Sequence, residues 1–303
     1  MFEMLIGLPA SGKSYYALKL VEKGYIRHSS DEIRKQLFGA DGYSKQEQAA
    51  VFDELHKRVI ADLKQGKNVV YDATNLSRKK RMVFMDMIKD IDTGYEATLF
   101  VDDISNLKKR NAEREESVPE DVYDRMIRQF DPPMYFEGFD HIDVIVNDEV
   151  ENAGKYKDFS VLKNIPHDSK YHSETIGDHM ETAVKIMEKY TADNCLLAAA
   201  WLHDIGKPYV KSFLDNKGNE TKYARYYCHE HVGSYLWLLT WEADKYYTLD
   251  DALRIANLID MHMRPFAWEK SVKAAVNDMN MIGENEFKNL LLLNLADRCA
   301  SNC

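Results

Sequence analysis

The sequence has little of what secreted and membrane-spanning proteins need. Its four cysteines form no Cys-x-x-Cys pair, which argues against a disulfide framework and against a zinc ribbon. No run of about 18 apolar residues occurs, so no membrane span and no membrane partner are expected. Because functional sequence begins close to Met1, we expect no signal peptide and a cytoplasmic location.

Positive charge is also in short supply. Lys and Arg number 40 against 50 Asp and Glu, so the formal net charge is −10. This charge argues against a broad nucleic-acid-coating surface but leaves room for a narrow basic channel that holds one strand end. Two basic runs are candidates for such a channel, although charge runs are usually solvated helix faces. They are Arg78-Lys79-Lys80-Arg81 and Lys108-Lys109-Arg110.

The length of the chain predicts two domains. A chain of 303 residues is long for one core, and two domains of about 150 residues are the usual solution. A strand–helix rhythm runs to residue 146 and then stops, and the segment Asp148–Gly154 is polar and contains a glycine. We therefore expect one domain over residues 1–150 and a second, mostly helical domain over residues 151–303.

A phosphate-binding motif begins at Gly7. Residues 7 to 14 match G-x-x-x-x-G-K-[ST], after an apolar run and before a helical pattern. In this context the backbone N–H groups and the helix N-terminus attract phosphate, Lys13 reaches the β- and γ-phosphates, and Ser14 holds Mg²⁺. The alternative is a glycine-rich turn at a strand–helix junction. We expect ATP or GTP with Mg²⁺, bound by Gly7, Ala10, Ser11, Gly12, Lys13 and Ser14.

The first half alternates between strands and helices. Helical patterns at about 45–65, 77–90 and 104–129 lie between short apolar or β-branched runs. This alternation predicts an α/β domain with a parallel sheet covered by helices on both faces and with ligands at the carboxyl ends of the strands. The expected strands are Met4–Ile6, Tyr25–Ile26, Val69–Tyr71, Ala97–Val101 and Ile142–Val146.

Charged residues after the second and third strands are candidates for catalysis. Asp31 is a plausible general base for phosphoryl transfer to a hydroxyl, although it competes with a role as a helix N-cap. Arg34 lies one turn later and is placed to clamp an acceptor phosphate. Asp72 follows the third strand and is a candidate to bind Mg²⁺ through water or to orient Arg34, and Asn75 is a candidate helix cap.

Two arginines suggest a lid over the nucleotide. Arg110 and Arg114 are four residues apart in one helical pattern, so both can face the same ligand. Arginines that stabilise the transition state of phosphoryl transfer raise rates by roughly 10³ to 10⁵. The alternative is an ordinary surface helix, with Glu113, Glu115 and Glu116 beside the arginines.

The first 146 residues resemble phage-type polynucleotide 5′-kinases. The resemblance implies a 5′-hydroxyl acceptor on RNA or DNA, with Asp31 as the base and Arg34 near the acceptor phosphate. It also implies that Asp72 supports Arg34 and that Arg110 and Arg114 close over the ATP phosphates. P-loop kinases of small molecules and of toxins also contain the motifs at Asp31–Arg34 and Asp72–Asn75, so these two motifs are less specific than the phosphate loop. The resemblance rests on Gly7–Ser14, Ser30–Arg34, Asp72–Asn75, Lys109–Arg114 and Val118–Val122, in this order, with Ala10 where many such kinases have glycine.

The second half is rich in histidine. Seven of the ten histidines lie between His167 and His262, and helices are predicted over Thr175–Tyr190 and around Leu196–Trp201. His203-Asp204 ends a buried helix, and Asp297 interrupts an apolar run, so each carboxylate needs a partner. A metal ion is the economical explanation. Such ligands suit Mn²⁺, Fe, Co²⁺, Ni²⁺ or Zn²⁺ better than Ca²⁺.

The pattern of these residues resembles the HD-domain phosphohydrolases, which are helical, metal-dependent hydrolases of phosphate esters. The resemblance covers about residues 167–300 and includes Ile205-Gly206-Lys207 after the His-Asp doublet. It implies metal ligation by His179, His203, Asp204 and Asp297. His229 or His231, together with His262, is a candidate for holding a second metal ion. Lys207 is a candidate for binding a substrate phosphate or for an ordinary solvated lysine.

Together the two halves predict a bifunctional enzyme that heals nucleic-acid ends. One half is expected to phosphorylate 5′-hydroxyl ends with ATP, and the other to remove a 3′-phosphate or a 2′,3′-cyclic phosphate. RNA ends are a more natural substrate than DNA ends, and a ligase is the expected partner because it needs both products. Two alternatives stay open: a kinase of a nucleoside or metabolite joined to a nucleotide hydrolase, and a nucleotide-controlled switch that regulates the HD half.

Overall fold

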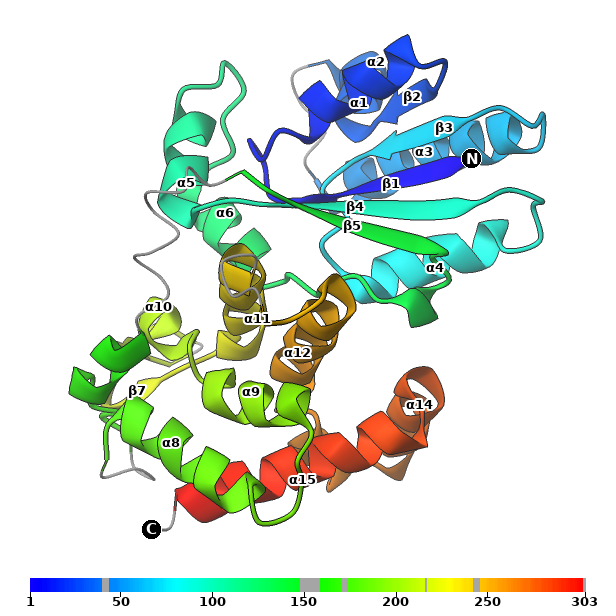
Figure 1. Ribbon diagram of the computed structural model, residues 1–303. Helices are drawn as coiled ribbons and strands as arrows, with labels where there is room; N and C mark the ends of the chain where they lie inside the picture. Colours follow the sequence, from blue (N-terminus) through cyan, green and yellow to red (C-terminus); the bar gives the residue numbers. More distant parts are fainter. Residues whose placement is uncertain (40–43, 148–158, 170–173, 216, 242–245, 302–303) are drawn as a thin grey trace. The chain divides into compact units, whose positions relative to one another are not determined.

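The computed structural model describes residues 1–39, 44–147, 159–169, 174–215, 217–241 and 246–301 (Figure 1). The chain forms two compact units. The first comprises Met1–Met126 and Pro133–Asn147, and the second comprises Ile127–Pro132 and Asp148–Cys303. The polar segment 148–154, expected as a connection, lies outside the described residues. In the part of the chain that is described, no helix combines the length and the apolar character that crossing a membrane requires.

The first unit contains a five-stranded sheet in the order β2-β3-β1-β4-β5, with every neighbouring pair parallel. The chain moves one way along the sheet from β1 to β2 and the opposite way afterwards. Right-handed crossovers therefore place its connecting helices on both faces. Four expected runs fall within strands, the fifth, Tyr25–Ile26, overlaps the start of β2, and the predicted α/β class is confirmed. The strands are β1 (Phe2–Gly7), β2 (Ile26–Ser29), β3 (Val69–Asp72), β4 (Tyr95–Val101) and β5 (His141–Val146).

The core of this unit forms where the sheet meets α1. Every residue of β1 is buried, as expected for a central parallel strand covered on both sides. Leu5, Val70 and Phe100 from three strands pack with Ala17 and Leu20 of α1. The helices are α1 (Lys13–Glu22), α2 (Ser30–Phe38), α3 (Lys45–Leu63), α4 (Arg78–Ile88), α5 (Ile104–Ala112) and α6 (Glu120–Ile127), with a short 3-10 turn η1 (Tyr135–Glu137).

The prediction of one continuous helix over residues 104–129 was wrong. α5 ends at Ala112 and α6 begins at Glu120. The Asn111 side chain donates to the Val118 carbonyl oxygen at 2.8 Å and accepts from the Val118 amide at 3.1 Å. A side chain that satisfies the backbone in this way stabilises a turn in place of further helix.

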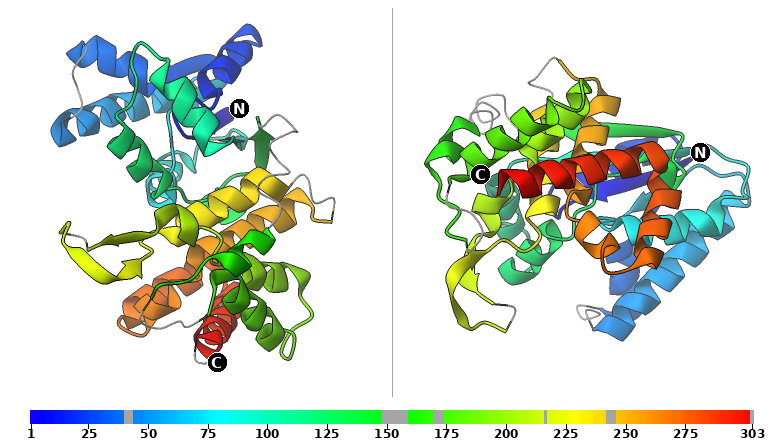
Figure 2. Two further views of the ribbon diagram at one scale, coloured as in Figure 1. Left: turned by 90° about the vertical axis from the view of Figure 1, so that its left-hand side faces the viewer. Right: turned by 90° about the horizontal axis from the view of Figure 1, so that it is seen from below.

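The second unit is mostly helical, as expected, but it also contains an antiparallel hairpin that the sequence did not reveal. Two views of the ribbon show this hairpin extending beyond the helices of its unit (Figure 2). The hairpin consists of β6 (Ser212–Leu214) and β7 (Glu220–Arg225). The other elements of the second unit are η3 (Phe159–Asn164), α8 (Ile176–Met187), α9 (Asn194–Leu202), α10 (Lys207–Val210), α11 (His229–Thr240), α12 (Leu249–Met261), α13 (Pro265–Trp268), α14 (Val272–Ile282) and α15 (Glu284–Ala300).

Apolar faces of α8, α9, α12 and α15 form the core of this unit. Met187, Leu196, Leu258 and Leu293, one from each helix, belong to one buried cluster. Side-chain caps fix where these helices begin: Thr175 accepts from the Asp178 amide before α8, and Asp193 and Thr248 act in the same way before α9 and α12. The ends of these helices, where the polar residues lie, are therefore set by local sequence.

Candidate functional site

The phosphate loop between β1 and α1 depends on backbone conformations that favour glycine. Gly12 has φ +95° and Gly7 has φ +153°. A Cβ atom at Gly7 would also lie 2.9 Å from the Phe100 carbonyl oxygen, so no larger residue fits there. Ala10 adopts a left-handed φ of 65°, which is strained for alanine and explains why many related loops have glycine at this position.

Lys13 is the charged centre of this loop. Its Nζ donates to the carbonyl oxygens of Gly7 at 2.8 Å and Leu8 at 2.6 Å, and to Ser11 Oγ at 3.2 Å. Burial lowers the pKa of Lys13 to about 8, Asp72 and Asp31 oppose this shift, and Arg114 adds to it. The structure thus brings Lys13 within electrostatic reach of three other predicted residues. Ser14, on the first turn of α1, is exposed and available for a ligand.

Asp31 and Arg34 form one unit at the start of α2. Arg34 Nη1 donates to Asp31 Oδ1 at 2.6 Å, and Arg34 Nη2 donates to Gln48 at 3.2 Å. Arg34 is buried, whereas the Asp31 side chain is 62% exposed and accessible to an acceptor. The N-cap of α2 is Ser29, which accepts from the Glu32 amide, so Asp31 does not serve as the cap.

Asp72 contacts a different arginine from the one that the resemblance implies. Arg27, on β2, donates to Asp72 Oδ2 from Nε at 2.9 Å and from Nη2 at 2.7 Å, and it also pairs with Glu32. The expectation that Asp72 supports Arg34 is therefore corrected, because the parallel register places Ser29, close to Arg27, opposite Asp72. Asn75 donates to the Leu5 carbonyl oxygen at 2.8 Å, and Ser77 is the N-cap residue of α4.

The two lid arginines do not share a helix. Arg110 lies on α5 and pairs with the buried Asp102, which follows β4. Arg114 is exposed in the turn after α5, and its amide bonds to the Asn111 carbonyl oxygen. The expectation of an i,i+4 pair on one helical face was wrong, because the helix ends two residues before Arg114.

Arg78, Arg81 and Lys108 of the two basic runs are paired with carboxylates. Arg81 is fully buried and donates twice to Glu137, at 2.7 Å from Nε and from Nη2, while Arg78 is 7% exposed beside the same carboxylate. Lys108 pairs with Asp124 at 2.6 Å and with Glu120. Arg78, Arg81 and Lys108 are therefore held by acidic partners and are not available to line a channel. Lys79, Lys80 and Lys109 remain exposed, and Arg110 is one of the two arginines expected to form a lid.

Three further side chains were not singled out from the sequence: Asn147 and Tyr123 bond to the loop, and Asp102 holds Arg110. Asp102 and Asn147 each follow a strand, and Asn147 Nδ2 donates to the Ser11 carbonyl oxygen at 2.9 Å. Tyr123 on α6 donates to the Pro9 carbonyl oxygen at 2.9 Å. The rule that ligand-facing residues follow parallel strands was a sufficient signal for Asp102 and Asn147. No local signal pointed to Tyr123.

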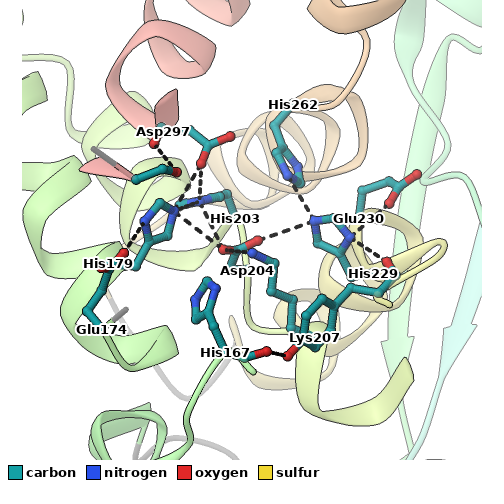
Figure 3. Close-up of polar contacts among 12 residues, drawn as sticks. His167, Glu174, His179, His203, Asp204, Lys207, His229, Glu230, His262 and Asp297 are labelled. Atoms are coloured by element: carbon teal, nitrogen blue, oxygen red, sulfur yellow. Dashed lines mark hydrogen bonds and ion pairs between the residues drawn. The ribbon is translucent and has the colours of Figure 1, made fainter. Parts of the chain in front are cut away.

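In the second unit, four predicted metal ligands converge from three helices (Figure 3). His179 lies on α8, His203 ends α9, Asp204 follows it, and Asp297 lies on α15. His179 Nε2 is 3.0 Å from Asp297 Oδ1 and 3.3 Å from His203 Nε2. Asp204 Oδ2 is 3.6 Å from His179 Nε2 and 3.4 Å from His203 Nε2. The donor atoms of His179, His203 and Asp204 are close enough together to hold a single ion, and Asp297 Oδ1 lies beside both imidazoles.

Asp204 also faces a second group of imidazoles. Its Oδ1 lies 3.2 Å from His229 Nε2, which in turn lies 3.1 Å from His262 Nε2. A Cβ atom at Gly206 would lie 2.1 Å from the His229 carbonyl oxygen, so only glycine lets the chain after Asp204 approach α11 this closely. Asp204, His229 and His262 are therefore a second set of donors that can hold a metal ion.

The three inward histidines are oriented by the backbone. His203, His229 and His262 each place Nδ1 2.7–2.8 Å from a carbonyl oxygen, of Ala200, Tyr226 and Ile259 respectively. An Nδ1–H donated to a carbonyl leaves Nε2 as the ligand atom, which is the usual arrangement around metal ions.

Burial and charge set the protonation of this cluster. Burial opposes ionisation of Asp204, but Lys207 and the neighbouring histidines hold the pKa of that carboxyl well below its usual range. Lys207 Nζ lies 2.6 Å from Asp204 Oδ2 and is buried, so it is not an ordinary solvated lysine. Burial and the nearby His229 and His203 lower the pKa of His262 to about 3, which makes it a neutral imidazole.

The electrostatics fit a divalent cation. Burial lowers the pKa of His203, but Asp204 and Asp297 outweigh this and raise it to about 10. The buried Asp204 and the partly buried Asp297 therefore favour a positive charge between them, and a metal ion among imidazoles supplies it. The residues present fit metal ions of the type that prefers nitrogen and oxygen ligands.

His231 lies outside both metal groups. Its Nδ1 is 2.7 Å from Asp260 Oδ1 and 3.6 Å from Asp131 Oδ1. These three residues form a separate group of possible ligands. Of the two histidines that the sequence offered as partners for His262, the structure places His229 beside it.

Comparison with known proteins agrees with this division. Residues 3–133 match a family model described as an AAA domain, and residues 171–302 match one described as an HD domain. The chain is a P-loop kinase domain joined to an HD domain. The fusion supports a kinase that uses ATP and Mg²⁺ and a phosphohydrolase that uses divalent metal ions.

Relatives of the P-loop domain include a kinase that acts on a charged tRNA. L-seryl-tRNA(Sec) kinase of Methanococcus maripaludis is 30% identical over 156 residues, which are 48% of this chain and 59% of that protein. The chain therefore spans well under two thirds of this relative. Among solved structures, the Pnkp1/Rnl/Hen1 RNA repair complex contains a chain that is 26% identical over 42% of this chain and 43% of its own length, with a TM-score of 0.36. A putative kinase from Chloroflexus aurantiacus is 16% identical, covers 48% of this chain and 84% of its own length, and has a TM-score of 0.41.

Proposed function

We propose that this chain heals nucleic-acid ends, with a kinase over residues 1–150 that phosphorylates 5′-hydroxyl groups and an HD hydrolase over residues 151–303 that removes a 3′-phosphate or 2′,3′-cyclic phosphate. The observation that carries the proposal is the presence of both domains in one chain. Cleavage that leaves 5′-hydroxyl and 3′-phosphate ends needs one phosphate added and one removed before a ligase of the common type can act.

In the kinase, Asp31 is the proposed general base. Its exposed carboxylate is held by the buried Arg34 at 2.6 Å and lies within electrostatic reach of Lys13. A carboxylate in this position accepts the proton of the attacking hydroxyl, while Lys13 and the lid arginines offset charge on the transferred phosphoryl group. Arg110 and Arg114 are those arginines, and Ser14 and Asp72 are the proposed contacts of Mg²⁺.

In the hydrolase, the proposed ligands of one ion are His179, His203, Asp204 and Asp297, and those of a second ion are Asp204, His229 and His262. Metal ions at such a site lower the pKa of bound water to about 7 and offset charge on the phosphate. The residues of the chain hold the donors in place: backbone carbonyls fix the imidazoles, and Lys207 restrains Asp204. Mn²⁺, Ni²⁺, Co²⁺, Fe and Zn²⁺ are the candidates.

RNA is the proposed substrate class, since the relative named L-seryl-tRNA(Sec) kinase phosphorylates a group carried by an RNA. A second candidate is a kinase of a nucleoside or metabolite joined to a nucleotide hydrolase. It is favoured by one observation: Arg78, Arg81 and Lys108 are paired with acidic residues and do not offer a basic channel. A nucleotide-controlled switch without kinase activity is the third candidate.

The test uses a short RNA with a 5′-hydroxyl and a 2′,3′-cyclic phosphate, together with labelled ATP, Mg²⁺ and Mn²⁺ or Ni²⁺. Label at the 5′ end with loss of phosphate at the 3′ end is the expected result. Labelling of a free nucleoside in place of the RNA would select the second candidate. If no labelled phosphate is transferred to any acceptor, the third candidate, a nucleotide-controlled switch without kinase activity, is favoured.

A further inference from the structure

The hairpin β6–β7 connects two segments of the chain that carry candidate metal ligands. It lies in the chain between Asp204 and His229, two of the proposed ligands, and only short connections separate it from each. Its base is fixed: Lys211 Nζ binds Pro166 O at 3.0 Å and Asp168 Oδ2 at 2.6 Å, and the Ala224 amide donates to Asp168 O at 2.9 Å. The base of the hairpin is therefore anchored to the segment Pro166–Asp168, and its two strands continue into the segments that carry Asp204 and His229.

The hairpin and its flanks expose large apolar side chains. Between residues 209 and 227, five such side chains are 39–49% exposed. A concentration of exposed aromatic residues of this kind marks a binding surface. The five are Tyr209, Phe213, Leu214, Tyr223 and Tyr227.

The charge of this segment is opposite to that of the chain. Residues 207–227 contain five basic and two acidic residues, a net charge of +3, within a chain of net charge −10. Two of the five cations are paired, Lys207 with Asp204 and Lys211 with Asp168. The other three are exposed: Lys222 and Arg225 lie on β7, and Lys217 lies between the two strands. The acidic residues of the segment are Asp215, which accepts bonds from its own turn, and Glu220.

Cations and rings alternate on the same ribbon. Lys222 Nζ lies 5.2 Å from the centre of the Tyr223 ring and is exposed. Lys211 Nζ lies 6.0 Å from that of Phe213 but is already bound to Asp168. A surface that offers exposed rings next to ammonium groups suits a polyanion that carries flat, apolar groups. Single-stranded nucleic acid is such a ligand, because its bases stack on aromatic rings while its phosphates contact the cations.

We propose that the β6–β7 hairpin binds single-stranded nucleic acid and guides its 3′ end to the HD metal site. This inference rests on the proposed hydrolase function and adds the surface that selects a polymer over a mononucleotide. Bases stack on Tyr223 and Phe213, and Lys222 and Arg225 contact the backbone. Since stacking on one ring strengthens binding by about 5- to 150-fold per base, the hydrolase discriminates by chain length.

The experiment compares kcat/KM of the full-length, metal-loaded enzyme for a ten-nucleotide RNA 3′-phosphate and for a nucleoside 3′-monophosphate. In Tyr223→Ala, the ratio of oligonucleotide to mononucleotide kcat/KM is expected to fall about tenfold. Tyr223→Trp restores the ratio, and Tyr223→Leu does not. Tyr190→Ala is the matched control, because Tyr190 is 65% exposed in the same unit but lies outside the hairpin. The ratio of oligonucleotide to mononucleotide kcat/KM in this variant is expected to equal that of the wild type.

Salt dependence tests the proposed cations. In Lys222→Ala with Arg225→Ala, the slope of log KM for the oligonucleotide against log salt falls by about 0.7 per residue. An unchanged slope overturns the contact with phosphates. The combined variant Phe213→Ala, Tyr223→Ala with an unaltered ratio overturns the stacking surface, while continued hydrolysis of RNA 3′-phosphate leaves the proposed function intact.

Two other outcomes also overturn the inference. If the wild type hydrolyses neither RNA 3′-phosphate nor cyclic phosphate, the proposed hydrolase function fails together with it. If the wild type binds phosphatidylserine vesicles, and the hairpin variants lose that binding while their RNA kinetics stay normal, the hairpin faces a membrane. Circular dichroism melting of each variant separates these results from unfolding.

Discussion

Arg27 holds the buried Asp72 with two hydrogen bonds to one carboxylate oxygen, at 2.9 and 2.7 Å. Removing one member of a buried ion pair leaves an uncompensated charge, which costs about 3–5 kcal/mol. Arg27→Ala is therefore expected to destabilise the P-loop domain by about 3 kcal/mol and to impair the kinase. Calorimetric melting and kinase turnover measure this. Arg58→Ala breaks a more exposed pair with Glu54 and should change stability by less than about 1 kcal/mol.

Variants of Arg27 and Arg34 decide which of these two arginines is the partner of Asp72. If Arg34→Ala destabilises the domain and Arg27→Ala does not, the support implied by the resemblance to polynucleotide kinases is the correct one. The sequence offered no way to find Arg27, because a single arginine on a short strand carries no motif. Its role follows from the pairing of β2 with β3, which sets Ser29 opposite Asp72.

Asp31→Asn is expected to abolish kinase turnover while ATP still binds. General bases contribute about 10² to 10⁴ in rate, and an amide cannot accept the proton. The amide oxygen of asparagine can still accept the bond from Arg34, so the fold around α2 is preserved. Turnover and nucleotide affinity are measured separately. Asp53→Asn, an exposed change on α3, is the control, and full activity in Asp31→Asn would remove Asp31 from the mechanism.

Asp204→Asn is expected to remove hydrolase activity and spare the kinase. Asp204 is 1% exposed and lies within 3.2–3.6 Å of His229, His203 and His179, so it contacts both candidate ions. Asparagine keeps the size and gives Lys207 a partner but removes the charge that binds metal. Both activities are assayed on the same preparation. Loss of both would show that this carboxylate holds the whole chain together and is not specific to the hydrolase.

Elemental analysis distinguishes the two histidines at the start of α11. His229 Nε2 lies 3.1 Å from His262 Nε2, whereas His231 contacts Asp260 at 2.7 Å. His229→Gln is therefore expected to lower the metal content of the purified chain by about one ion, since imidazole is a preferred ligand of such ions. His231→Gln should leave the content unchanged. A loss in His231→Gln would instead place an ion in the group that contains Asp131 and Asp260.

Motifs and periodicity revealed much of this molecule. The phosphate loop and the five strands could be predicted because each has a local pattern. The resemblance to HD-domain phosphohydrolases led to His179, His203, Asp204 and Asp297, which the structure brings close together, and their role as metal ligands stays a prediction. Helical geometry also shows that His229 and His231, about 200° apart around α11, do not both face one ion. Which of them faces the ion depends on the position of α12, and no local sequence encodes that.

The features that were missed depend on contacts that are distant in sequence or on short, weak elements. The turn after α5 arises from one side chain, Asn111, that bonds to the backbone of Val118. The burial of Arg78 and Arg81 depends on Glu137, which follows one strand and two helices further along the chain. β6 has only three residues and pairs with β7 through an irregular register, so it shows no usable alternation.

The stability of the P-loop domain should depend on the ionisation of Glu3. This residue on β1 is 3% exposed, and it accepts a hydrogen bond from Thr98. Burial raises the pKa of Glu3 from 4.5 to about 7, with Glu96 adding to the shift and Thr98 opposing it. The folded state thus binds a proton that the unfolded state releases between these two values. Stability from this group is complete below pH 4.5 and is lost as the pH rises through 7.

Glu3→Gln replaces the carboxyl with a neutral group of the same shape and should abolish this loss. The variant is expected to match the wild type near pH 4.5 and to become more stable above pH 7, by on the order of 3 kcal/mol. All four tryptophans lie in the second unit, so calorimetry is the suitable measurement and tryptophan fluorescence is not. Glu22→Gln, an exposed change on α1, is the control. A difference between Glu3→Gln and wild type that stays constant from pH 5 to pH 9 would show that Glu3 does not titrate in this range.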